Sequence, residues 1–279
     1  MSTEDIERGL NLIKADTPKN IQAMLDSDNP DLNEAGKIEA RLRRKDAENK
    51  EKIRNFIPSI INKIKDGKAL KNISDNFNDL PESRKNSIAN RSLRLAECDK
   101  HIEISSIPAF ADSVERLHYL EDEPNLAELF EELLISIIDS SKKYINHPAY
   151  VEVLKQISNQ EAHNLKLIFS HSPNSIAICN FGFKHHNGGT ITLLKYCLPI
   201  PFSEIPAQAL ENWERLKLIE IVIDLEWITD DSSYKYAQDI LAALEKENAS
   251  YAEHLEIRKG VLRFTEFGKN FAKAVGIIK

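Results

Sequence analysis

The segment from Leu126 to Ile138 has the strongest helical periodicity in this chain of 279 residues. Its apolar residues recur three and four positions apart, which places them along one face of an α-helix. Pro124 starts the segment, and the acidic residues before it suit the positive end of a helix dipole. The apolar positions are Leu126, Phe130, Leu133, Leu134, Ile137 and Ile138. We therefore predict a helix that lies in the core.

Two helix-start signals come after this helix. Asn146 is predicted to cap a helix whose first turn holds Pro148. We expect the ring of His147 to fix the entering loop by a hydrogen bond to the backbone or to a carboxylate, rather than to take part in chemistry. Ser158 and Glu161 have the spacing of a capping box, which predicts the start of another helix.

The apolar period then changes to that of β-strands. Residues 176–198 alternate on both sides of Asn187-Gly188, which predicts a β-hairpin. Residues 216–225 predict a further strand, and residues 255–264 predict a second hairpin that turns at Lys259-Gly260. The order of helices, strand and hairpin is that of a winged helix, in which the first hairpin is an inserted element.

The last predicted helix begins at Thr265, which is expected to cap it, with Gly268 in its first turn. The first hundred residues contain helical patterns only, including a long helix over residues 30–65 that Pro58 should kink or divide. We predict a mainly α chain of the α+β class. Residues 1–105 form an accessory helical module, and residues 106–279 form a helical domain with a winged-helix-like end.

Composition limits the classes of function. The net charge is −7, from 37 Lys and Arg against 44 Asp and Glu, which argues against nonspecific binding to a phosphate backbone. Three scattered cysteines form no disulfide framework and suit a reducing compartment. The first residues have no apolar region of a signal peptide, and no run of 18 apolar residues exists. We therefore expect a cytoplasmic protein without a membrane span.

Four segments, taken in order, carry a family resemblance. They are Leu126–Leu134, Asn146–Val151, Trp213–Ile219 and Leu262–Gly268. Together they resemble the abortive-infection alpha family over residues 107–275. The resemblance implies a bacterial or prophage-borne protein associated with defence against phage, and it implies no assigned reaction. This chain differs in having Lys217 where the family often has glycine, and in a long stretch over residues 175–198.

Four basic residues gather near the predicted wing and the last helix: Arg258, Lys259, Arg263 and Lys269. Such residues contact phosphates in a DNA-binding winged helix. The candidate recognition helix, residues 205–215, is poorly charged for a major groove, however, so these residues favour contact with a protein partner.

No motif for catalysis, a cofactor or a metal stands out. His185 and His186 are neighbours on a strand and point to opposite faces, so they do not easily share a metal ion, even with His171 nearby. We therefore expect a non-catalytic protein without a cofactor that binds a partner protein or itself. The alternatives are a winged-helix DNA-binding regulator and, less favoured, a metal-dependent hydrolase at these three histidines.

Overall fold

The computed structural model describes residues 18–62, 67–97, 103–171, 174–184, 189–247 and 254–278. The chain divides into two compact units, one ending at Ser59 and the other starting at Ile60. The predicted boundary after residue 105 lies inside the second unit.

In the described residues of the first unit lie α2 (Pro18–Leu25) and all but the end of α3 (Pro30–Ile61). They pack closely at Gly36, where an added Cβ would lie 3.0 Å from the Cβ of Met24. The Asn33 side chain also donates a hydrogen bond to the carbonyl of Leu25 at 2.5 Å. Of the two effects predicted for Pro58, division of the long helix does not occur, because α3 continues through it for one further turn. The helix expected from Thr3 lies outside the described residues.

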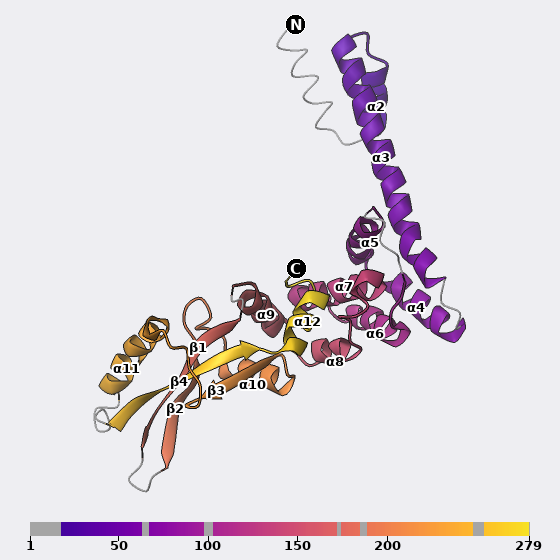
Figure 1. Ribbon diagram of the computed structural model, residues 1–279. Helices are drawn as coiled ribbons and strands as arrows, with labels where there is room; N and C mark the ends of the chain where they lie inside the picture. The colour runs from indigo at the N-terminus through magenta and orange to yellow at the C-terminus, as the bar shows by residue number, and fades with distance from the viewer. Residues whose placement is uncertain are drawn as a thin grey trace. The chain divides into compact units, whose positions relative to one another are not determined.

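The helical part of the second unit is built around the predicted core helix. This helix, α7 (Pro124–Ile138), contacts α5, α6, α8, α9 and α12 (Figure 1). The helices of this part are α4 (Gly67–Asp79), α5 (Glu82–Glu97), α6 (Ile107–Leu117), α8 (Ala149–Lys155), α9 (Asn159–His171) and α12 (Glu266–Ala274). A short 3₁₀ helix, Ser140–Lys142, follows α7. Apolar residues all round α7 are buried, which confirms the prediction of a core helix.

A buried ion pair attaches α5 to α7. The Glu131 carboxylate is 5% exposed and accepts hydrogen bonds from the Arg84 guanidinium at 3.0 Å and from the Ser87 hydroxyl at 2.6 Å. Arg84 also donates to the carbonyl of Leu120 at 3.2 Å. Because a buried carboxylate is costly without partners, these bonds make α5 part of the same core.

The strands form one antiparallel sheet in the order β2-β1-β4-β3. They are β1 (Ser175–Lys184), β2 (Thr190–Cys197), β3 (Ile219–Ile223) and β4 (Leu255–Phe264). The hairpin predicted for residues 176–198 is confirmed as β1 and β2. It is not an insertion, however, because β1 pairs with β4 from Ser175 to Phe183 and so forms half of the sheet.

The predicted second hairpin is wrong, because residues 255–264 form the single strand β4. Gly260 does not turn the chain. It lies opposite Ile223 in β3, where an added Cβ would meet the carbonyl oxygen of Val222 at 2.3 Å. The glycine therefore permits a close approach of two strands. The predicted wing is thus absent, and the chain is mainly α with a four-stranded antiparallel sheet.

Helices pack on both faces of the sheet (Figure 1). On one face, Cys179 and Phe181 form a buried cluster with Ala237 and Leu244 of α11 (Lys235–Glu247). On the other face, the rings of Phe169 in α9 and Phe264 in β4 lie 4.2 Å apart. A 3₁₀ helix, Asp231–Tyr234, precedes α11, and α10 (Ala207–Arg215) contacts β2 and β3. The sheet is therefore joined to the helical part through α9 and α10.

A polar cleft between three helices

The segment before α8 has a structural role that differs from the prediction for Asn146. The helix begins at Ala149 and its N-cap is Pro148, so Asn146 does not cap it. Asn146 instead bonds to Ser136 of α7, accepting from the hydroxyl at 2.7 Å and donating to the carbonyl at 2.6 Å. The Nδ1 atom of His147 accepts a hydrogen bond from the Ala149 amide at 3.1 Å. This is a hydrogen bond to the backbone of the kind expected for His147.

The capping box of α9 is confirmed and also faces a cleft. The Ser158 hydroxyl accepts from the Glu161 amide at 3.2 Å, and Glu161 Oε2 accepts from the Ser158 amide at 2.9 Å. The second oxygen of the same carboxylate, Oε1, accepts from the Asn212 side chain of α10 at 2.8 Å. A local helix-start motif is therefore bonded to a helix that lies about fifty residues later in the chain.

The cleft lies where the end of α8 and the start of α9 face α10, and its volume is about 620 Å³. We call it the amide cleft, because side-chain amides dominate its lining. It is lined by Gln156, Ser158, Gln160, Glu161, Asn164, Pro206, Gln208, Ala209, Glu211, Asn212 and Arg215.

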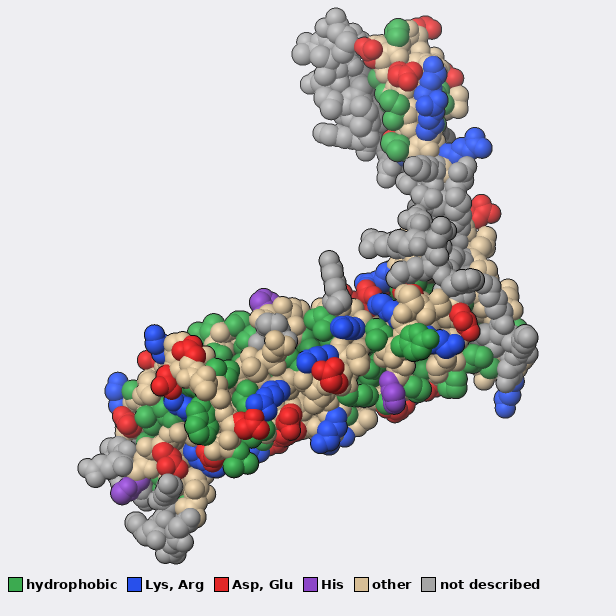
Figure 2. Space-filling view, in the orientation of Figure 1, with side chains coloured by type: hydrophobic (Ala, Val, Ile, Leu, Met, Phe, Trp, Pro, Cys, Tyr) green, Lys and Arg blue, Asp and Glu red, His purple; other side chains and the backbone are tan. Residues whose placement is uncertain are grey.

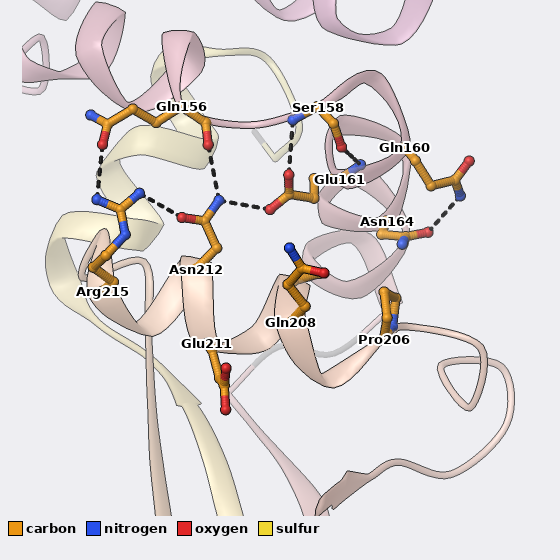
Figure 3. Close-up of a pocket in the computed structure, with 11 residues that line it drawn as sticks. Gln156, Ser158, Gln160, Glu161, Asn164, Pro206, Gln208, Glu211, Asn212 and Arg215 are labelled. Carbon is orange, nitrogen blue, oxygen red and sulfur yellow. Dashed lines mark hydrogen bonds between the residues drawn. The ribbon is translucent and has the colours of Figure 1, made fainter.

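A line of hydrogen bonds crosses the amide cleft (Figure 3). Arg215 donates to Gln156 Oε1 at 2.9 Å and to Asn212 Oδ1 at 2.6 Å. Asn212 in turn donates to the Gln156 carbonyl at 2.9 Å, besides its bond to Glu161. These bonds hold the polar groups in fixed positions, whereas the neighbouring Gln208 projects from α10 without a partner among the described residues.

The arrangement favours recognition over chemistry. Both carboxylates of the amide cleft are engaged, Glu161 in the capping box and Glu211 with the Lys195 ammonium at 2.5 Å. These bonds compete with any role of either carboxylate as a general acid or base. Side-chain amides, by contrast, offer a donor and an acceptor side by side, which matches the peptide group of another chain.

The start of α12 is held by the motif predicted around Thr265 and Gly268. The Thr265 hydroxyl accepts from the Gly268 amide at 2.9 Å, which confirms the cap. The same hydroxyl donates to the carbonyl of Lys217. Gly268 is buried against the backbone of Leu218, where an added Cβ would lie 2.0 Å from the carbonyl oxygen. The motif therefore joins α12 to the turn after α10.

The four predicted contact residues are all engaged in ion pairs. Lys259 lies 2.6 Å from a carboxylate oxygen of Asp231, and Lys269 lies 2.9 Å from one of Glu266. The guanidinium of Arg258 pairs with Asp224, and that of Arg263 pairs with Glu226. The ion pair with Glu226 raises the pKa of Arg263, and the pairing lowers the pKa of Glu226. The positive charge that a phosphate would need is therefore already balanced by the chain's own carboxylates.

The distribution of charge agrees with this local pairing. Lys and Arg side chains are interspersed with Asp and Glu on the face of the second unit seen in Figure 2. Together with the single strand that replaces the predicted wing, this gives the DNA-binding regulator no support.

The proposed histidine site is only partly described. The Nδ1 of His171 lies 2.9 Å from the carbonyl oxygen of Leu167, one turn earlier in α9. His185 and His186 lie outside the described residues. Within the described ranges, no three His, Cys, Asp or Glu side chains gather as a metal site would require. None of the described helices has the length and apolar character needed to cross a bilayer.

Comparison with models of protein families assigns the chain to one family. The family model described as abortive infection alpha matches residues 79–275, which is more than half of the chain. The chain belongs to the abortive infection alpha family. No curated protein and no solved structure matches it.

The match to the abortive infection alpha family spans most of the second unit. It includes the amide cleft, the whole sheet and α12. It starts at Asp79, earlier than the expected residue 107, and therefore takes in α5 with its buried pair to Glu131. The resemblance at residues 107–275 is confirmed and extended by one helix.

Sequence reasoning found Ser158 and Glu161 but missed the cleft that they line. Gln208 and Asn212 were visible as amide residues on a helix, yet nothing in the sequence places that helix against α9. Gln156 and Arg215 are ordinary surface residue types, and only the folded chain brings them together.

Proposed function

We propose that this chain is a non-catalytic protein of bacterial defence against phage, of the abortive-infection type, and that it acts by binding a partner protein in the amide cleft. Membership of the abortive infection alpha family supports the link to defence. The observation that carries the proposed mode of action is the composition of the amide cleft, whose carboxylates are bonded while the amide of Gln208 has no partner in the described part of the chain.

The charge of the amide cleft favours a polypeptide over a nucleic acid. The cleft contains Glu161 and Glu211 but only one basic residue, Arg215. Because Lys195 also pairs with Glu211, a polyphosphate would find no excess of positive charge there, in a chain whose overall charge is negative. A peptide backbone carries no net charge, and its donors and acceptors match the amide groups. An extended segment of a partner protein is therefore the ligand that fits.

The test uses a bacterial host that carries the chain and is challenged with a panel of phages. Gln208→Trp fills the amide cleft without removing any hydrogen bond of its wall. We expect it to weaken protection at least about tenfold, the effect of losing roughly 1.4 kcal/mol of binding free energy. Gln238→Trp is the matched control, because Gln238 is also an exposed glutamine of a helix, α11, but lies outside the cleft.

A photo-crosslinking residue placed at the same two positions tests whether a protein occupies the cleft. We expect position 208 to yield a protein adduct during infection that position 238 does not yield. That adduct should disappear when Asn212→Ala breaks the wall of the cleft. Equal protection by both tryptophan variants, or the same adducts at both positions, would exclude the proposed binding site.

The non-catalytic part of the proposal has its own test. The purified chain is incubated with nucleotides, RNA and DNA, and product formation is followed. We expect no turnover. Hydrolysis that remains after repeated purification and is lost in Glu161→Gln would contradict the proposal and make the cleft an active site.

A further inference from the structure

Two cysteines face each other across the first hairpin of the sheet. Cys179 of β1 and Cys197 of β2 are directly paired in the antiparallel register. Directly paired residues have Cα atoms about 4.5 or 5.5 Å apart, depending on the type of pair. Both values lie within the range of about 4.4–6.8 Å that disulfides span. The register therefore sets the two Cα atoms at a separation that a disulfide can span.

The two side chains also share one environment. Cys197 packs against the buried cluster that contains Cys179, Phe181, Ala237 and Leu244. Paired residues of neighbouring strands lie on the same face of a sheet, and here that face is covered by α11. Cys179 is buried, whereas Cys197 is half-buried at an edge strand. A small reagent therefore reaches Cys197 first.

A bulge fixes this pairing at the end of β2. Phe181 pairs with Leu194, so β2 has one residue more than β1 between this pair and the cysteine pair. Tyr196 takes up the difference with a φ of 59°. Its amide donates to the side chain of buried Asn180 at 2.8 Å. This bond stabilises the register that places the two cysteines opposite each other.

We propose that Cys179 and Cys197 form a site of oxidative modification that takes up an intramolecular disulfide from a low-molecular-weight disulfide. The thiolate of Cys197 attacks one sulfur of the small disulfide and releases one small thiol. The thiolate of Cys179 then attacks the sulfur of Cys197 and releases the second small thiol. Two protein thiols are oxidised, one small disulfide is reduced, and the two protons end on the released thiols.

The surroundings make this exchange slow and specific. Burial raises the pKa of Cys179, and it raises the pKa of Cys197 to about 11. A small fraction of thiolate at neutral pH means a low rate. The Cys179 thiol lies 3.5 Å from the hydroxyl oxygen of Tyr236, which also lies 3.0 Å from the Cys197 carbonyl oxygen. Once the disulfide forms, Cys179 has no S–H group left to donate to the Tyr236 hydroxyl of α11.

The experiment uses the full chain with Cys98→Ser, so that only the two cysteines of the pair remain. The folded protein is incubated with oxidised glutathione at mildly alkaline pH, then unfolded in N-ethylmaleimide and weighed by intact mass spectrometry. We expect a product two hydrogens lighter than the reduced chain, without maleimide or glutathione, and a peptide map that joins residues 179 and 197. A glutathione adduct with the other thiol alkylated, disulfide-linked dimers or two alkylated thiols would each overturn the proposal.

Single variants establish the order of the two steps. Cys179→Ser should stop at one glutathione on Cys197, because the second thiol is missing. Cys197→Ser should leave Cys179 unmodified over the same time, because that thiol is buried. Glutathione on Cys179 at the same rate as on Cys197 would contradict the order. The result does not depend on the proposed function, since it is measured on the purified chain alone.

Discussion

At the scale of single residues, Lys217 occupies a backbone position that favours glycine. It follows the last residues of α10 with a φ of 61°, a conformation that favours glycine. The amide of Leu218 donates to the Trp213 carbonyl and that of Lys217 to the Glu214 carbonyl, both at 2.9 Å. This is the Schellman pattern, in which glycine usually occupies the position of Lys217. The chain keeps this backbone geometry with a lysine, whose Cβ makes the left-handed conformation strained.

Replacing this lysine should therefore stabilise the protein. The left-handed conformation costs an L-residue about 1–2 kcal/mol, and glycine loses about 0.5–1 kcal/mol more backbone entropy on folding. We expect Lys217→Gly to raise the free energy of unfolding in urea by roughly 0.5–1 kcal/mol. Lys217→Ala is the control, since its Cβ keeps the strain. A gain of the same size in both variants would show that the backbone is not the cause.

Gly268 is needed for the opposite reason, because no atom fits beside it. A Cβ there would lie 2.0 Å from the carbonyl oxygen of Leu218, which is backbone and cannot rotate away. We expect Gly268→Ala to lower the free energy of unfolding by about 3 kcal/mol, at the upper end of overpacking effects. Gly189→Ala is the matched control, because no atom lies within 4 Å of its added Cβ. Thermal unfolding of both variants measures the difference, and equal melting temperatures would contradict the close packing.

At the scale of elements, polar bonds between helices decide how they are attached. The side chain of Asn159, at the start of α9, accepts from the amides of Asn125 at 2.8 Å and Leu126 at 3.2 Å. Thus α7 is capped by another helix, while its own N-cap residue, Glu123, makes no side-chain bond. The sequence indicated where α7 starts, but the group that caps it comes from 34 residues later.

The buried ion pair of Arg84 in α5 and Glu131 in α7 predicts different stabilities for a single and a double variant. Arg84→Met leaves Glu131 buried without its main cation, and we expect the free energy of unfolding to fall by about 3 kcal/mol. Adding Glu131→Leu should recover most of this loss, because no unpaired charge then remains. Urea unfolding measures both. A double variant less stable than Arg84→Met would show that the carboxylate stabilises α7 by other bonds.

At the scale of the whole molecule, the position of α5 decides what can fold alone. The second unit starts at Ile60 and includes α4 and α5, which contact α6 and α7. We expect a fragment of residues 60–279 to unfold cooperatively. A fragment of residues 106–279 should not, because it lacks Arg84 and leaves Glu131 unpaired. Circular dichroism during heating distinguishes them, and a stable fragment 106–279 would support the boundary predicted from the sequence.

The sequence by itself determined the elements whose signals are local. Apolar periodicity identified α7, alternation around Asn187-Gly188 identified the first hairpin, and the Ser158 and Thr265 caps lie where residue types placed them. These features depend on residues within a few positions of each other, so their interactions can be read directly from the chain.

Only the tertiary structure decided what these elements do together. Lys259-Gly260 has the composition of a turn, yet it lies inside a central strand because β1 and β3 satisfy its backbone on both sides. The basic residues near it pair with carboxylates of a distant loop, and the amide cleft forms between helices separated by some fifty residues. Pairing over such separations depends on packing of the whole chain, which no local pattern contains.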